Sequence, residues 1–106
     1  MHVTMVWWDL TESIQTIDSL REYLRGEAVD AFADVVGLRL KIWVADPATN
    51  RWGSILLWES REAAAGPNPG RAVQLIGYPP TRRLTFDVEA TVEGRHGIGE
   101  TGPARR

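Results

Sequence analysis

The chain has 106 residues, of which 43% are hydrophobic and 25% are charged, and its formal net charge is −2. This length suits one domain, and the slightly acidic balance argues against a nucleic-acid-binding protein, which normally carries a basic surplus. The chain has no cysteine, which excludes disulfides, thiolate catalysis and cysteine-ligated metals. No apolar run reaches the roughly 18–20 residues that cross a bilayer, and no signal peptide is recognisable, so we expect a cytoplasmic protein without a membrane partner.

The first quarter of the chain predicts a strand followed by a helix. Residues 3–8 are apolar and β-prone, which favours a first strand, and residues 9–13 are a loop rich in helix-capping residues. From about Thr16 apolar residues recur at helical spacing, which predicts an amphipathic helix with one packed face. These residues are Ile17, Leu20, Leu24, Ala28 and Phe32. Gly26 weakens this helix by roughly 1 kcal/mol relative to alanine, so packing must hold it.

The middle of the chain predicts a β-hairpin. Gly37 is typical of the turn out of the helix, and residues 38–45 then alternate in polarity. One side of this strand carries Leu38, Leu40, Ile42 and Val44, and the other carries Arg39, Lys41 and Trp43. Residues 46–50 have turn chemistry, and residues 51–59 form the returning strand. On that strand Trp52, Ser54, Leu56 and Trp58 share one side.

The last part of the chain predicts a broken helix, a strand and a tail. Ser60 is typical of a helix cap, but Gly66-Pro67-Asn68-Pro69-Gly70 stops the helix, and residues 71–76 form a short second piece. After a turn at residues 77–80, residues 83–92 alternate again as a fourth strand. Residues 94–106 have little to bury and are expected to form a mobile tail, which leaves one domain at residues 1–93.

The element order β-α-β-β-α-β is that of a ferredoxin-like α+β fold with a four-stranded antiparallel sheet and helices on one side. Strands two and four carry apolar side chains in both directions, which favours a C2 homodimer whose second sheet covers the free side. The alternative is a monomer with a half-polar open side. Two alternating polar rows, Arg39 with Lys41 and Thr85 with Asp87 and Glu89, suit either that monomer or charge pairs at a dimer rim.

Sequence segments that are characteristic of a known family occur in the hairpin and around the fourth strand. They comprise Gly37 to Asp46, Gly53, Leu57-Trp58-Glu59-Ser60-Arg61-Glu62-Ala63-Ala64, Pro79-Pro80, Phe86-Asp87-Val88 and Val92-Glu93. These segments resemble the YdhR-like mono-oxygenase family, which belongs to the antibiotic-biosynthesis mono-oxygenase type of dimeric α+β barrel. The resemblance covers about residues 3–93. It implies a homodimer with sheets packed face to face, a pocket between helices and sheet, and oxygenation of an aromatic or polyketide-like substrate without metal or flavin.

The chain departs from the family pattern in the second helix and its surroundings. That helix usually runs on for several turns and forms one wall of the pocket, whereas here it is broken, so the pocket is expected to be smaller, more open or absent. The characterised enzymes carry an asparagine four residues before the strand-three tryptophan and a tyrosine six residues after it. The corresponding residues here are Ser54 and Ala64. No histidine stands on the second helix, which argues against haem as a cofactor.

Cofactor-free oxygenation needs a base, a donor for an oxyanion and an apolar cavity that excludes water. Trp58 is a candidate catalytic residue that stacks on a flat substrate or donates its indole N–H, and its other interpretation is a core tryptophan. Ser54 shares its side of the strand and is a candidate contact. Asp9 is the candidate base, although a residue at that position also suits a helix cap.

Four further residues are candidate substrate contacts. Lys41 suits an anionic substrate or an oxyanion, or else an ion pair with Asp87 or Glu89 across the dimer. Trp43 and Trp8 are flat side chains near the expected pocket, and Tyr78 offers a phenol or only shapes its turn. The histidines at positions 2 and 96 lie at frayed ends and make no metal site.

The sequence therefore predicts a cofactor-independent mono-oxygenase acting on a small aromatic or polyketide-type compound, with no metal and no other cofactor. A non-oxidative polyketide cyclase or aromatase on the same scaffold is the first alternative. A non-catalytic small-molecule-binding dimer is the second, and the broken helix and the missing asparagine and tyrosine favour it. The size of the pocket, and whether it collapses on Trp58, separates the enzymes from the binding protein.

Overall fold

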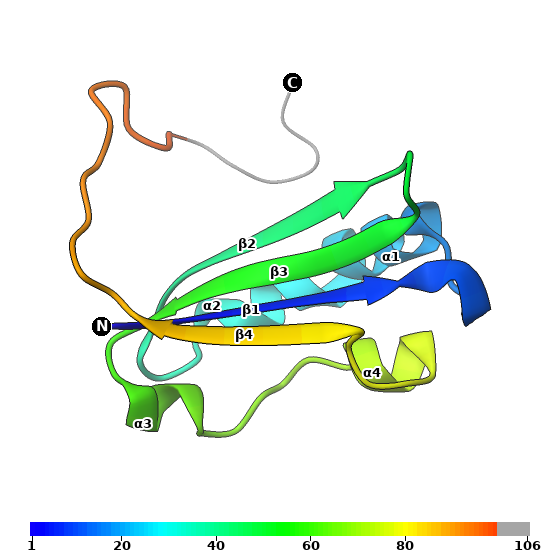
Figure 1. The fold of residues 1–106 in the computed structure, drawn as a ribbon, viewed down its shortest axis with the longest axis horizontal. Coiled ribbons are helices and arrows are strands. Elements are labelled where there is room, and N and C mark those ends of the chain that lie inside the picture. Colours follow the sequence, from blue (N-terminus) through cyan, green and yellow to red (C-terminus); the bar gives the residue numbers. More distant parts are fainter. Residues whose placement is uncertain (100–106) are drawn as a thin grey trace.

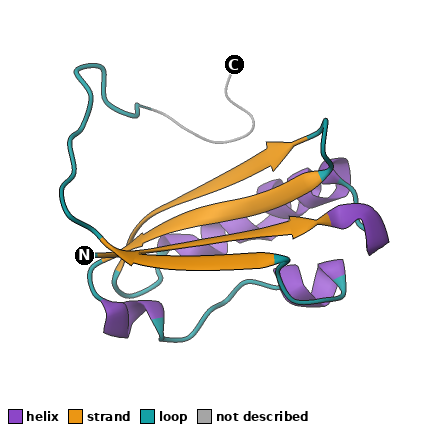
Figure 2. Cartoon of the chain, in the orientation of Figure 1, coloured by secondary structure: helices purple, strands orange, loops and turns teal. Residues whose placement is uncertain are grey.

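A computed structural model describes residues 1–99 as an α+β structure built around one four-stranded antiparallel sheet (Figures 1 and 2). The strands are β1 (His2–Asp9), β2 (Leu38–Asp46), β3 (Arg51–Trp58) and β4 (Arg82–Asp87). The helical elements are the 3-10 turn η1 (Leu10–Glu12), α1 (Ile17–Tyr23), the π-helical η2 (Leu24–Ala28), α2 (Val29–Ala33), α3 (Arg61–Ala64) and α4 (Ala72–Ile76).

The strand order across the sheet is β2-β3-β1-β4, and each neighbouring pair is antiparallel. The β2–β3 hairpin therefore lies on one side of β1, and β4 lies on the other. In Figure 1 the helices α1 and α2 lie behind the sheet, while α3 and α4 lie along its β4 side. This arrangement is compatible with the predicted ferredoxin-like fold.

The first helical stretch runs from Ile17 to Ala33 without interruption, as its apolar spacing predicts. Thr16 caps it by accepting a hydrogen bond from the backbone N–H of Ser19, and the Ser19 hydroxyl accepts one in return from the Thr16 N–H. The middle of the stretch widens to a π-helical turn at η2, which contains Gly26. Within residues 1–99 no helix combines the length and the apolar character needed to cross a bilayer.

The hydrophobic core lies between these helices and the sheet. One cluster comprises Trp8, Leu10, Ile17, Leu20, Leu24, Ala28, Trp52 and Ile76, and a smaller one comprises Phe32, Leu56 and Trp58. Three of the five tryptophans are therefore core residues, each no more than 5% exposed. Each removes a large apolar area from water, which is the dominant favourable term for a chain of this size.

A β-bulge at the start of β2 changes one predicted side-chain orientation. Leu38 pairs with Trp58 while Leu40 pairs with Leu57, so the register shifts between them. Leu38 consequently packs with the Phe32 cluster, on the opposite side of the sheet from Leu40. Uniform alternation from Leu38 onward was the wrong prediction, because a bulge places two residues of one strand against one of its neighbour.

The second helix is short because proline and glycine follow it, as the sequence indicates. Ser60 caps α3 by accepting a hydrogen bond from the Ala63 N–H, and the helix ends before the residues 66–70 that cannot continue it. Helix α4 ends at Gly77, whose φ of 105° is readily adopted only by glycine.

Strand β4 is shorter than predicted, since it ends at Asp87 rather than residue 92. Its pairing with β1 closes with a hydrogen bond from the Val88 N–H to the Met1 carbonyl. Of the predicted tail, residues 94–99 contain a turn closed by the Gly97 N–H and the Gly94 carbonyl, and residues 100–106 lie outside the described part.

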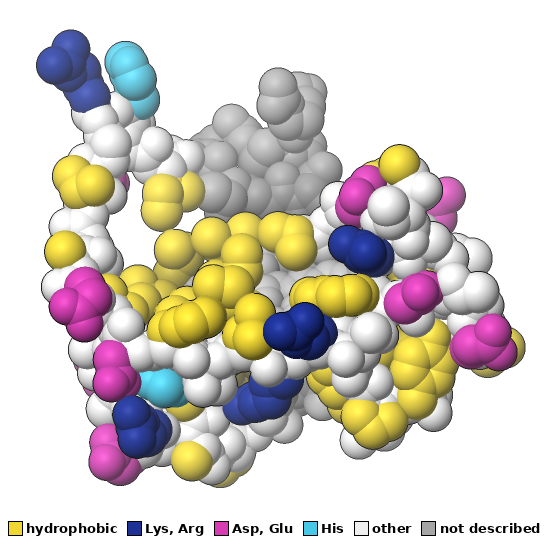
Figure 3. Space-filling model, viewed as in Figure 1, with side chains coloured by type: hydrophobic (Ala, Val, Ile, Leu, Met, Phe, Trp, Pro, Cys, Tyr) yellow, Lys and Arg dark blue, Asp and Glu magenta, His cyan; other side chains and the backbone are white. Residues whose placement is uncertain are grey.

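One side of the sheet has no helix over it and is mostly apolar (Figure 3). We call it the open face and define it by the apolar residues that the strand register places there: Val3, Met5, Trp7, Leu40, Ile42, Val44, Ile55, Leu57, Leu84 and Phe86. Arg51 and Arg82 lie on the same side, beside Trp7. Ile42 is 45% exposed and Phe86 49% exposed. The polar rows that suited a half-polar monomer, including Lys41, Thr85 and Asp87, lie on the helix side instead.

Two glycines give opposite expectations for the same substitution. A Cβ on Gly53 would lie 2.4 Å from the Val6 carbonyl oxygen and 2.8 Å from the Trp7 Cβ, so Gly53→Ala should lower the free energy of unfolding by about 1–3 kcal/mol or more. A Cβ on Gly26 would meet nothing within 4 Å, so Gly26→Ala should raise it by about 0.5–1 kcal/mol. Urea denaturation of the two variants measures both changes in the free energy of unfolding. Equal changes for Gly53→Ala and Gly26→Ala would contradict the close packing of β3 against β1.

Candidate functional site

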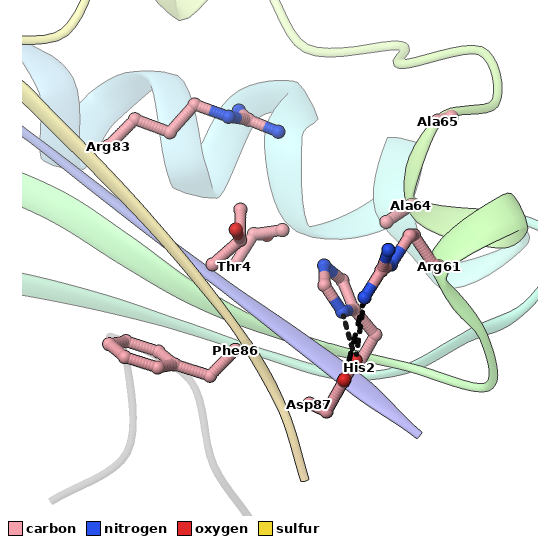
Figure 4. Close-up of a pocket in the computed structure, with 9 residues that line it drawn as sticks. His2, Thr4, Arg61, Ala64, Ala65, Arg83, Phe86 and Asp87 are labelled. Carbon is pink, nitrogen blue, oxygen red and sulfur yellow. Dashed lines mark hydrogen bonds and ion pairs between the residues drawn. The ribbon is translucent and has the colours of Figure 1, made fainter.

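The break in the second helix leaves a pocket on the helix side of β1 and β4, which we call the α3 pocket (Figure 4). Its volume is about 600 Å³, within the range of small-molecule sites. Its lining comprises His2, Thr4, Arg61, Ala64, Ala65, Arg83, Thr85, Phe86 and Asp87. The side chains of β4 that face the helix side are polar. A continuous second helix packed over them would require apolar partners, so the polar sequence of β4 is consistent with the break in that helix.

A histidine, an aspartate and an arginine meet at one end of the α3 pocket. The buried His2 places its ring Nδ1 3.4 Å from Asp87 Oδ1, and Arg61 Nη2 donates to both oxygens of the same carboxylate at 3.2 and 3.4 Å. The hydrogen bonds from Arg61, and then from His2, hold the pKa of Asp87 below its ordinary value. Asp87 therefore stays a carboxylate at neutral pH and can orient the His2 ring, leaving Nε2 for chemistry.

Thr4 joins the α3 pocket to the core behind it. Its hydroxyl accepts a hydrogen bond from Trp58 Nε1 at 3.2 Å, and both residues are no more than 5% exposed. Trp58 itself packs with Phe32 and Leu56 and is not part of the lining. Its link to a ligand in the pocket therefore runs through the Thr4 hydroxyl.

Arg83 lies at the other end of the α3 pocket from Asp87, and its side chain extends from β4 across the pocket above Thr4 (Figure 4). Within residues 1–99 it forms no ion pair, in contrast to Arg61. Its guanidinium can thus receive an anionic group of a bound molecule, because arginine offers several fixed N–H donors.

Three predicted site residues lie together elsewhere, at the far end of β1, and hold the fold there. Trp8 Nε1 donates to the Tyr78 carbonyl at 2.9 Å, and the Tyr78 hydroxyl donates to the Asp9 carbonyl at 2.6 Å. The Asp9 carboxylate accepts from the Thr11 N–H at 2.9 Å as the cap of η1, and its hydrogen bonds with Thr11 lower its pKa. None of the three lines the α3 pocket.

Lys41 and Trp43 lie in a second cavity, at the β2 edge of the sheet. This β2–α2 groove has a volume of about 700 Å³ and is lined by Leu24, Val29, Phe32, Ala33, Leu38, Arg39, Leu40, Lys41, Ile42, Trp43 and Ile98. Lys41 Nζ lies 3.3 Å from the centroid of the Phe32 ring and 4.7 Å from that of Trp43. Burial lowers the pKa of Lys41 to about 7.

The ion pair considered for Lys41 with Asp87 or Glu89 does not form within the described chain. Asp87 lies at the β4 edge and is paired with Arg61, while Lys41 lies at the β2 edge. Both side chains are on the helix side, so a second sheet on the open face would not bring them together. The remaining candidate, Ser54, is buried between the Val6 and Trp43 positions of the neighbouring strands and lines neither cavity.

The lowered pKa of Lys41 makes a prediction for stability. Between pH 7 and about pH 10.4 the unfolded chain holds the Lys41 proton and the folded chain does not, so the free energy of unfolding should rise with pH. Relative to Lys41→Met, the wild type should gain on the order of 2 kcal/mol across this interval. Urea denaturation of both proteins at pH 7 and 10 measures the difference, and a constant difference would contradict the burial of the amine.

The α3 pocket contains residues that sequence reasoning missed. His2 was interpreted as part of a frayed end, but β1 begins at His2, and pairing with Trp58 and Asp87 on either side buries it. Thr4 and Trp8 lie on one side of β1, and extending the two-residue alternation back to residue 2 places His2 on the same buried side. Arg61 and Arg83 had no signal of their own, because exposed arginines are common on strands and helix ends.

No protein-family model matches the chain, and no curated protein matches it either. The similarity of residues 37–64 to the YdhR-like mono-oxygenases therefore stays a prediction from the sequence. In the part of the chain that the structure describes, no three metal-ligating side chains come together. The geometry of the α3 pocket is thus the basis on which a function can be argued.

Proposed function

We propose that this protein is a homodimeric, cofactor-independent mono-oxygenase that binds a small aromatic or polyketide-type compound in the α3 pocket. The observation that carries the proposal is a pocket of about 600 Å³ with the buried His2 paired to the exposed Asp87 at one end and Arg83 along it. A base and a cationic group facing one space are what proton removal from a weakly acidic substrate requires. The resemblance of the β2–β3 hairpin supplies the reaction type.

In this proposal His2 Nε2 takes the acidic proton of a phenol or an anthrone while Asp87 holds the ring through Nδ1. The electron-rich anion transfers one electron to dioxygen, the radical pair forms a carbon–oxygen bond, and the resulting peroxide loses water to leave a carbonyl. The proton on His2 goes to the departing hydroxide. One CH₂ group and one dioxygen thus give one carbonyl and one water.

Other residues stabilise the charge that forms. Arg83 faces the pocket as a cation that forms no ion pair within residues 1–99, and it can hold the oxyanion of the deprotonated substrate. The Thr4 hydroxyl accepts from Trp58, which leaves its own hydrogen free to donate toward the pocket. Trp58 acts in this scheme as a positioning residue for Thr4 rather than as a stacking surface.

The proposed dimer rests on the open face. Ten apolar side chains cover one side of a sheet whose other side is packed by helices, and an exposed apolar patch of this extent is typical of an interface. A second copy related by a two-fold axis would match the face with itself and complete a dimeric α+β barrel. The described residues place no helix over this side.

A non-oxidative cyclase or aromatase is the second candidate, and the polar lining of the α3 pocket favours it. His2, Asp87, Arg61 and Arg83 suffice for enolisation and loss of water, which need no oxygen. A binding protein without turnover is favoured by the open pocket wall beside Ala64 and Ala65, because an enzyme that forms a reactive carbanion benefits from excluding water.

Oxygen consumption by metal-stripped protein with a panel of anthrones and naphthols tests the proposal. We expect uptake in a one-to-one ratio with the quinone formed, unchanged by chelators and reduced in Trp58→Phe. Product formed without oxygen uptake would establish the cyclase instead. Binding without any product would overturn both enzymatic proposals.

A further inference from the structure

The chain has twelve lysine and arginine residues in total. Lys41 is the only lysine, and the other eleven are arginines. Arginine stays protonated in proteins, whereas a lysine amine can lose its proton and become a nucleophile. The chain therefore has one side-chain amine, and it lies in the β2–α2 groove rather than in solvent. This groove is at the opposite sheet edge from the α3 pocket and takes no part in the proposed oxygenation.

The surroundings of Lys41 are apolar and aromatic. Phe32 and Trp43 are arranged edge to face with ring centroids 5.8 Å apart, and Lys41 Nζ lies over both rings. Leu24, Val29, Leu38 and Ile42 supply most of the remaining wall. A groove of about 700 Å³ beside the amine can hold the apolar body of a small ligand.

Within residues 1–99 no acidic side chain lines the groove beside the amine. Arg39 is the only other charged residue among the described lining, and as a cation it cannot pair with an ammonium; its guanidinium lies 4.0 Å from Glu59. Asp30 on α2 and Asp34 at its C-cap are exposed and do not line the groove. The faces of the two aromatic rings attract an ammonium, while burial of Lys41 lowers its pKa to about 7.

We propose that the β2–α2 groove is a binding site for a small aldehyde or ketone with an apolar body, held by a reversible imine with Lys41. The neutral amine adds to the carbonyl carbon to give a carbinolamine, which loses water to form the C=N bond. Phe32 and Trp43 lie beside the new bond, and the apolar wall holds the rest of the ligand. Hydrolysis reverses the bond, so no oxidant or other co-reactant is needed.

Reductive trapping tests the proposal on the wild-type protein. Hexanal and sodium cyanoborohydride are added at pH 6 to 9, and the alkylated sites are located by peptide mass analysis. The α-amino group of Met1 is the one other primary amine and serves as an internal reference. We expect Lys41 to react at least about tenfold faster at pH 7 than free Nα-acetyl-lysine, because an ordinary lysine is almost fully protonated there.

The matched comparison replaces hexanal with glyoxylate, which has a reactive carbonyl but no apolar body. Lys41 should prefer hexanal, while the α-amino group should show no such preference, and Lys41→Arg should lose the groove-specific product. Reaction of Lys41 at the rate of free lysine, or an equal rate with both aldehydes, would overturn the proposal. Since the measurement is made on the wild type, a variant that fails to fold does not affect the result.

Discussion

Ile42→Asp should convert the proposed homodimer into a monomer. Ile42 is 45% exposed in the isolated chain and lies on the open face, midway along the edge strand β2 and next to Ile55 of the neighbouring strand. Association would bury two such carboxylates, one from each copy, against apolar side chains without a partner. Each buried unpaired charge costs several kcal/mol, so the dimer should weaken by about a thousandfold or more.

Sedimentation velocity at micromolar concentration measures this effect. The wild type should sediment as two chains and Ile42→Asp as one, with an unchanged circular dichroism spectrum, because the side chain is half exposed in the monomer. Ile14→Asp is the matched control, since Ile14 is 91% exposed and lies outside the open face. A monomeric wild type, or a dimer that survives Ile42→Asp, would refute the assignment of this face as the interface.

His2→Gln should lower kcat by about 10²- to 10⁴-fold on any phenol or anthrone that the wild type turns over. Glutamine keeps a polar group near Asp87 but cannot accept and hold a proton, so the contribution of the base is lost. His96→Gln is the matched control, because His96 is the only other histidine and is exposed in the loop after β4. It should leave kcat unchanged.

Asp87→Asn separates orientation from proton transfer. It removes the carboxylate that faces His2 Nδ1 and also the partner of Arg61, so it should lower kcat by less than His2→Gln does. Equal kcat values for wild type and His2→Gln would show that another group takes the proton. The site would then have to be placed outside the His2 end of the α3 pocket.

Local patterns predicted the elements that depend on near neighbours. Ser60 caps α3 where the sequence indicates, and residues 66–70 end this helix because proline and glycine cannot continue it. The hydrophobic spacing of the first helix and the hairpin turn at residues 46–50 were likewise readable, since each is fixed within a few residues. The coarse α+β architecture follows from this order of elements.

Features that depend on distant pairing could not be read in advance. Burial of His2 requires β3 and β4 on both sides of its strand, 56 and 85 residues away along the chain. The bulge between Leu38 and Leu40 is set by pairing with β3 and leaves no mark in the alternation. The predicted site residues lie in three separate places. Residues that share one side of a strand need not face the same cavity, because distant pairing and helix packing determine where the cavities lie.

The most direct test of the central claim is to titrate 1-naphthol into ¹⁵N-labelled protein and follow the backbone amides and the tryptophan indole resonances. Binding in the α3 pocket predicts saturable shifts at Thr4 and Thr85 and at the Trp58 indole N–H that donates to Thr4. Shifts confined to Phe32 and Trp43, or no saturable shifts at all, would contradict the placement of the aromatic site at the α3 pocket.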